Sequence, residues 1–118
     1  IKALLRADLF SDELEAADEL LSKGFHRAAG VIVGVVLEEK LTAFCRECGV
    51  TLEKPKPALG DLVSALRDSQ HLKEADIYLL SRLTYLRNNF IHDRPDEPSA
   101  EDAKELIVGA RRIVSSMV

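Results

Sequence analysis

Apolar residues recur at helical spacing along most of the chain, and the last segment shows this most clearly. Ser99 is followed three residues later by Asp102, a pair that can cap the start of a helix through two reciprocal hydrogen bonds. The next residues repeat at intervals of three and four, which is the spacing of one helix face. They are Ala103, Leu106, Ile107, Ala110, Ile113, Val114 and Met117. This pattern predicts a C-terminal helix with one buried face.

The segment 25–48 is the most apolar part of the chain. Its stretch 28–37 is rich in Val and carries no polar side chain, so by itself it resembles a buried strand. However, the apolar spacing continues to Cys48 with charged residues between, and no second strand candidate is present to pair with it. We therefore expect a helix, and an all-round apolar helix is a central one. Gly30 and Gly34, one turn apart, should let a neighbouring helix approach closely.

The N-terminal segment allows two interpretations. Residues 1–10 have helical spacing and form either an arm or the start of a longer first helix. Ser11 or Asp12, with Glu15 after them, resembles the cap of a new helix. Gly24 is expected to end the helix that follows.

The remaining segments complete the bundle. Residues 51–57 contain two prolines and predict a loop. A short apolar stripe at 59–66 predicts a third helix, and residues 73–91 predict a fourth, which ends before Pro95 and Pro98. The fold class is therefore all-α: an antiparallel bundle of four to five helices in one domain, residues 1–118.

Charge and composition narrow the function classes. The formal net charge is −4, which argues against a broad basic face for nucleic acid but allows a local phosphate site. Trp is absent and aromatics are scarce, which disfavours binding of bases by stacking. Two Cys and no signal-like start favour a reducing cytoplasm, and the longest apolar run is too short to span a bilayer. Because the chain starts at Ile1, we expect an excised domain or missing leading residues.

Several other polar groups are weaker candidates. Cys45 and Cys48 form a C-x-x-C pair at a helix end, without further zinc ligands at suitable spacing, so core packing is the better interpretation. His26 and His71 have no local catalytic partner and are expected at the surface. Two alternatives stay open for the adjacent carboxylates at positions 38 and 39. Both face solvent, or one turns inward and pairs with an Arg of the fourth helix.

The strongest candidate site is the end of the fourth helix. Arg87, Asn88 and His92 gather there, while Leu86 and Phe90 are expected to anchor the turn in the core and leave the polar side chains facing outward. A guanidinium can bind phosphate oxygens, and an imidazole can transfer a proton near neutral pH, so the trio suits phosphoryl transfer without a metal. The alternative is that a helix-end cation merely favours the helix dipole.

The spacing of the two charged residues sets a geometric condition. Arg87 and His92 are five residues apart, which on a straight helix is a rotation of about 140°. They can therefore share a site only if the helix ends or unwinds before His92, or if a second chain completes the site.

This stretch resembles the R-x(4–6)-H signature of the HEPN superfamily, in which a polar residue commonly follows the Arg. Arg87, Asn88 and His92 match it with the shortest spacer, and Asp93 departs mildly from the small residue that often follows the His. Further similarity lies at residues 20–29, 36–41 and 99–103, and it covers about residues 11 to 117.

The resemblance implies a metal-independent endoribonuclease that needs no cofactor. Active members are homodimers whose two motifs form a composite cleft, with Arg87 here stabilising the phosphate, His92 acting as general acid or base, and Asn88 positioning. The required 2′-hydroxyl would restrict the substrate to RNA and exclude DNA. Such members act in toxin–antitoxin and phage-defence settings, under an antitoxin or a fused regulatory domain.

Two alternatives remain. Other members of the superfamily have lost cleavage and serve as nucleotide- or protein-binding modules, which the acidic charge of this chain favours. If the motif is coincidental, the chain is a helical packing domain of a larger protein.

Overall fold

Five helices make up the described part of the chain. The structure is a computed structural model that describes residues 2–92 and 98–116, with side chains from Phe10 onward. The helices are α1 (Lys2–Ser22), α2 (His26–Glu47), α3 (Leu59–Asp68), α4 (Glu74–Ile91) and α5 (Ala100–Ser116). These residues include no strand. The all-α prediction, including the helical assignment of the valine-rich segment, is therefore confirmed.

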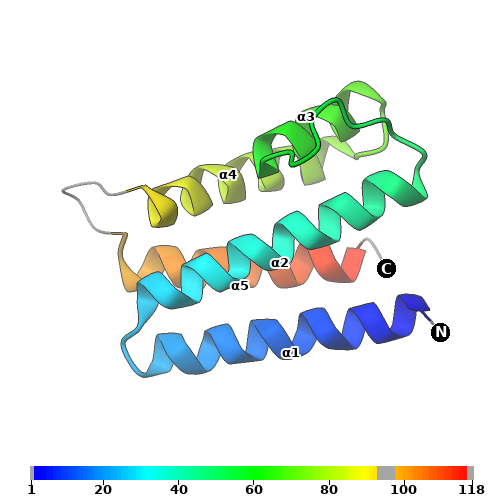
Figure 1. Cartoon of the computed structure of the whole chain (residues 1–118). Helices are drawn as coiled ribbons and strands as arrows, with labels where there is room; N and C mark the ends of the chain where they lie inside the picture. Colours follow the sequence, from blue (N-terminus) through cyan, green and yellow to red (C-terminus); the bar gives the residue numbers. More distant parts are fainter. Residues whose placement is uncertain (1, 93–97, 117–118) are drawn as a thin grey trace.

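The helices pack around α2, which contacts each of the other four. In Figure 1, α1 lies along one side of α2, the α3–α4 pair lies along the opposite side, and α5 lies behind α2. The chain reverses direction between α1 and α2, and α4 runs antiparallel to α2. As a result, the α1–α2 turn and the end of α4 lie at the same end of the bundle (Figure 1).

α1 is one continuous helix, so the prediction of a separate helix capped at Ser11 or Asp12 is wrong. Residues 2–10 form the start of the longer first helix instead of an arm. The physical reason is that nothing interrupts the helix, because neither Gly nor Pro occurs before Gly24.

The first two interhelical turns are made by glycines in the left-handed region. Gly24 has φ +87° and Gly49 has φ +71°, a conformation that costs other residues energy. After each glycine, the next backbone N–H donates to the carbonyl five residues back at 2.9 Å, which closes the helix end. The predicted ends of α1 and α2 are confirmed. Gln70 adopts the same conformation, φ +62°, after α3.

The predicted cap at the start of α5 is confirmed, and α3 has a similar cap that the sequence analysis did not predict. At the start of α5, the Ser99 hydroxyl accepts from the Asp102 backbone N–H at 3.1 Å, and the Asp102 carboxylate accepts from the Ser99 N–H at 3.3 Å. At the start of α3, the Asp61 carboxylate accepts from the Ala58 N–H at 3.0 Å. This bond, followed by one from Lys54, holds the pKa of Asp61 below its usual value. Pro95 and Met117, which were part of the predicted pattern, lie outside the described residues.

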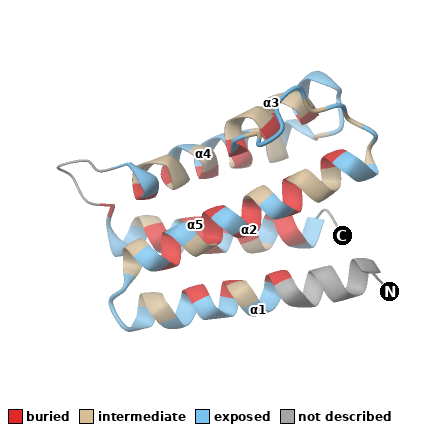
Figure 2. Ribbon diagram, in the orientation of Figure 1, coloured by how far each residue is buried: buried red, intermediate tan, exposed pale blue. Residues whose placement is uncertain are grey.

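Two glycines on α2 leave space in which side chains of α4 pack. A Cβ at Gly30 would lie 2.4 Å from the Phe90 ring, and a Cβ at Gly34 would lie 2.8 Å from Arg87 Cγ. The predicted close approach at these two glycines is therefore confirmed, and the approaching helix is α4. Figure 2 shows the buried faces of the helices turned toward one another. Along α2, however, the outer face is exposed, although the helix is central.

Candidate active site at the end of α4

Arg87 lies in the groove between α4 and α2. Its stem rests on Gly34, and its Nη2 forms an ion pair with Glu38 Oε1, one turn farther along α2. The Arg87 side chain is 15% exposed and that of Glu38 is 31% exposed. The inward alternative for the carboxylates at 38 and 39 is thus the one adopted, and it uses Glu38. The guanidinium is consequently fixed in position instead of moving freely at the surface.

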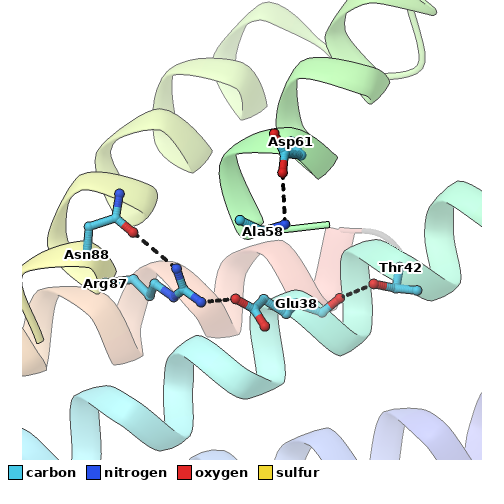
Figure 3. Close-up of polar contacts among 6 residues, drawn as sticks. All are labelled: Glu38, Thr42, Ala58, Asp61, Arg87 and Asn88. Atoms are coloured by element: carbon cyan, nitrogen blue, oxygen red, sulfur yellow. Dashed lines mark hydrogen bonds and ion pairs between the residues drawn. The ribbon is translucent and has the colours of Figure 1, made fainter. Parts of the chain in front are cut away.

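Asn88 holds the same guanidinium from the other side. Arg87 Nη1 donates to Asn88 Oδ1 at 3.1 Å, so the head group lies between an amide and a carboxylate (Figure 3). On α2, Thr42 Oγ1 donates to the Glu38 backbone carbonyl at 2.7 Å, which is a local contact within that helix (Figure 3). Asn88 is half-buried. The Asn therefore orients the Arg in this chain.

His92 lies just past the last residue of α4 and is exposed. Its backbone N–H still donates to the Asn88 carbonyl at 3.2 Å, and the chain leaves the helix only at His92 itself, with φ −96° and ψ 135°. The helix thus ends at Ile91, as predicted. Because it ends only one residue before His92, the change of direction does not turn His92 toward the side of α4 that carries Arg87. Because His92 Cα stays on the helical path, the rotation of about 140° between the two residues remains.

The expectation that all three polar residues face outward is therefore wrong for Arg87. His92 is exposed, Asn88 is half-buried, and Arg87 is mostly covered by α2. The reason is the missing side chain at Gly34, which leaves room for the Arg stem, together with a carboxylate at the right height on α2. Leu86 and Phe90 are each 1% exposed, so their anchoring role is confirmed.

Arg27 is a site residue that the sequence did not point out. Its Nη1 donates to the Phe90 carbonyl at 3.0 Å, across 63 positions of sequence. Carbonyls of the last helical turn have no partner within the helix and carry partial negative charge, which a guanidinium satisfies. Arg27 therefore ties the start of α2 to the last turn of α4, close to His92. No local sequence pattern links Arg27 to Phe90, because Arg27 by itself looks like an ordinary cation in the first turn of a helix.

The other polar candidates lie away from this site. Cys45 is buried and Cys48 is half-buried, both as free thiols. Burial, followed by the neighbouring Cys48, raises the pKa of Cys45, which agrees with the core interpretation. His71 is exposed and its Nδ1 lies 2.7 Å from Ser69 Oγ. His26 is half-buried, less exposed than a plain surface residue.

An open cavity of about 620 Å³ lies elsewhere, where the loop after α2 meets α3. Val50 and Leu52 contribute apolar surface, and Ser64 and His71 contribute polar groups. It includes none of the three candidate residues, so we do not assign the phosphate chemistry to it. Within residues 10–92 and 98–116, no group of three His, Cys, Asp or Glu side chains is placed to hold a metal ion. None of the helices, over the part that the structure describes, is long and apolar enough to cross a membrane.

Chemically, the end of α4 offers three groups of different kinds. Arg87 supplies an oriented array of N–H donors, Glu38 a carboxylate, and His92 an imidazole accessible to solvent. Such donors suit the non-bridging oxygens of a phosphodiester, and an accessible imidazole suits proton transfer. Comparisons of this chain with protein-family models, with curated proteins and with solved structures found no match.

Proposed function

We propose that this chain is a metal-independent endoribonuclease that acts as a homodimer with a composite Arg/His site. The observation that supports it most is the Arg87 guanidinium, held by Glu38 and Asn88 one turn before the exposed His92. A donor array that is already oriented stabilises developing negative charge without reorganising during the reaction. The resemblance of this stretch to the HEPN signature points to the same chemistry.

The reaction is an internal transesterification of RNA. The 2′-oxygen attacks the adjacent phosphorus and forms a new P–O bond, while the bond to the 5′-oxygen of the next nucleotide breaks. One proton leaves the 2′-hydroxyl and one is delivered to the departing 5′-oxygen. The products are a cyclic phosphate end and a 5′-hydroxyl end, and water takes no part. In this scheme Arg87 binds the non-bridging oxygens, and His92 accepts or donates a proton.

The geometry within one chain favours a composite site. Arg87 is turned toward α2, whereas His92 starts from the opposite part of the helical path. A second copy of the chain would supply the missing partner for each. In a cell, activity of this kind requires control, and the resemblance implies an antitoxin or a fused regulatory domain in a toxin–antitoxin or phage-defence setting.

The second candidate is a non-catalytic binding or dimerisation module. One observation favours it: Glu38 already neutralises Arg87, and the pair is largely covered. To bind a phosphate, Arg87 would have to share its donors between Glu38 and the ligand. A guanidinium has five N–H donors, so Arg87 can donate to Glu38 and to a phosphate at the same time.

Cleavage of total RNA in EDTA separates the two candidates. We expect the wild type to cut, and Arg87→Ala and His92→Ala each to lower the rate by about 100-fold or more. Arg82→Ala is the matched control, because Arg82 lies on the same helix in an exposed ion pair with Glu105 and should keep nearly full activity. An inert wild type would leave the binding module as the better account, and full activity in both site variants would show that Arg87 and His92 do not form the active site.

A further inference from the structure

The cavity beside α3 has the size and the mixed lining of a small-molecule site. The loop after α2 returns alongside α3 (Figure 1), and the open space between loop and helix is about 620 Å³. Sites that bind small molecules commonly enclose about 300–1,000 Å³. Val50 and Leu52 from the loop and Ala65 from α3 give the cavity an apolar wall. Because Val50 and Leu52 also pack against the core, this wall is part of the folded bundle.

The charged side chains that line the cavity leave it with an excess of negative charge. Three of them are carboxylates, those of Glu53, Asp61 and Asp68, and one is the amine of Lys54. Lys54 and Asp61 form an ion pair at 3.3 Å, so their charges cancel. Asp68 pairs with Arg67, but both side chains are more than half exposed and solvent weakens the attraction. Glu53 forms no ion pair within the part of the chain that the structure describes. The cavity therefore favours a cation over an anion.

The imidazole of His71 offers an acceptor nitrogen to the same cavity. Ser69 Oγ donates to the Leu66 carbonyl at 3.2 Å, and this bond uses the only proton of the hydroxyl. The hydroxyl oxygen can therefore only accept from His71 Nδ1, which lies 2.7 Å away. The neutral imidazole consequently carries its proton on Nδ1, and Nε2 is left as an acceptor. Gln70, with φ +62°, turns the chain back after α3 and brings His71 to the cavity.

Asp68 supplies a second acceptor, at a position where it does not help α3. It is the last residue of that helix, where the helix dipole favours cations and disfavours a carboxylate. Asp68 lies three residues before His71, and both line the cavity. An ammonium group has three N–H donors, so it can bind a carboxylate and an imidazole nitrogen at the same time.

We propose that this cavity binds a small organic amine with an apolar body. The ammonium group donates to the Asp68 carboxylate and to His71 Nε2, and the body lies against Val50, Leu52 and Ala65. A carboxylate or phosphate head group has no donor for these two acceptors and is repelled by the charge of the cavity. The cavity includes none of the three residues of the candidate active site, so the proposal holds whether or not the chain cuts RNA.

Three compounds with one apolar body and different head groups test the ligand class. The isotope-labelled full chain is titrated by NMR with phenylpropylamine, phenylpropanol and phenylpropanoate. We expect the amine to bind with a Kd of about 1 mM or tighter, the alcohol about tenfold more weakly, and the carboxylate more weakly still. Backbone signals of Val50, Leu52, Ala65 and His71 should shift. Equal affinity for the three compounds, or shifts only outside the cavity, overturns the proposal. Saturation by the amine only above about 10 mM also overturns it, because that is adventitious binding only.

Two substitutions test the two halves of the site separately. Asp68→Asn removes the charge at an exposed position and should weaken amine binding about tenfold, while binding of the alcohol stays nearly unchanged. Ala65→Met fills the apolar wall and should abolish binding of both compounds. Glu15→Gln is the matched control, because Glu15 is an exposed carboxylate on α1, and it should change neither affinity. Circular dichroism checks that each variant is folded. Wild-type affinity for the amine in Asp68→Asn, or in a folded Ala65→Met, overturns the proposal.

Discussion

On each of its two sides, α4 meets a neighbouring helix through an arginine–glutamate ion pair and a close contact with a glycine, but the surroundings of these contacts differ. Toward α2, Arg87 pairs with Glu38 in a largely covered groove. Toward α5, Arg82 pairs with Glu105 at 2.7 Å, and both side chains are about half exposed. Arg82 and Arg87 are five residues apart, so a rotation of about 140° sends them to opposite neighbours. Similar ion pairs therefore stand in different surroundings.

The glycines differ in the same way. On α5, a Cβ at Gly109 would meet a methyl group of Leu83 at 2.5 Å, and on α2 a Cβ at Gly30 would meet the Phe90 ring at 2.4 Å. Both side chains are fully buried, but Leu83 would meet the added Cβ mainly with a terminal methyl group, whereas Phe90 would meet it with three atoms of a rigid ring. The α2 side therefore fixes the position of the candidate site, and the α5 side mainly holds the helix in the bundle.

The largest expected effect is that of Gly30→Ala. Alanine favours the helix by about 1 kcal/mol, but its Cβ overlaps the Phe90 ring, so we expect a net loss of about 1–3 kcal/mol in the free energy of unfolding. Gly60→Ala is the control, because the nearest atom to its Cβ would be Thr84 Cγ2 at 3.8 Å. Chemical denaturation measures both variants. An equal effect of the two would mean that Gly30 has no special role in the packing of α4.

An intermediate effect is expected for the Arg87–Glu38 pair. Removing one partner leaves a poorly solvated charge, so a double-mutant cycle with Arg87→Met and Glu38→Gln should give a coupling of about 1–2 kcal/mol in unfolding. The same cycle with Arg82→Met and Glu105→Gln should give a smaller coupling, because solvent screens an exposed pair. Equal couplings, or a larger one at Arg82–Glu105, would remove the contrast between the two sides.

The smallest effect is a change in acid sensitivity on the α5 side. The hydrogen bond from Arg82 holds the pKa of Glu105 below its usual value. The pair therefore contributes fully above the unfolded value, about 4.3, and this contribution is lost as pH falls through the lowered pKa. Glu105→Gln and Arg82→Ala should each lose slightly less stability than the wild type across that range. Thermal melts at a series of pH values measure this, and three identical profiles would contradict it.

Local sequence patterns predicted the helices well because their causes are local. Apolar spacing, the prolines and the left-handed glycines act within a few residues, and they placed α2 to α5 within one or two residues of their ends. The failure at Ser11 and Asp12 is instructive. Residues that can cap a helix are also tolerated within one, and only an interruption before them would have started a new helix.

The candidate site was predictable in its residue types but not in its contacts. Arg87, Asn88 and His92 stand out because they are polar residues at a helix end. Which carboxylate would meet Arg87 stayed open, and the role of Arg27 was not expected, since the partners are 49 and 63 positions away.

The sequence by itself determined the helical segments, the glycine positions for close approach, and the polar end of α4. The tertiary structure decided that Gly34 and Glu38 face α4 at the level of Arg87, and that Arg27 reaches the Phe90 carbonyl. The physical reason is that helix formation depends on neighbours along the chain. Partner choice between helices depends instead on register and rotation, which are set by packing of the whole core.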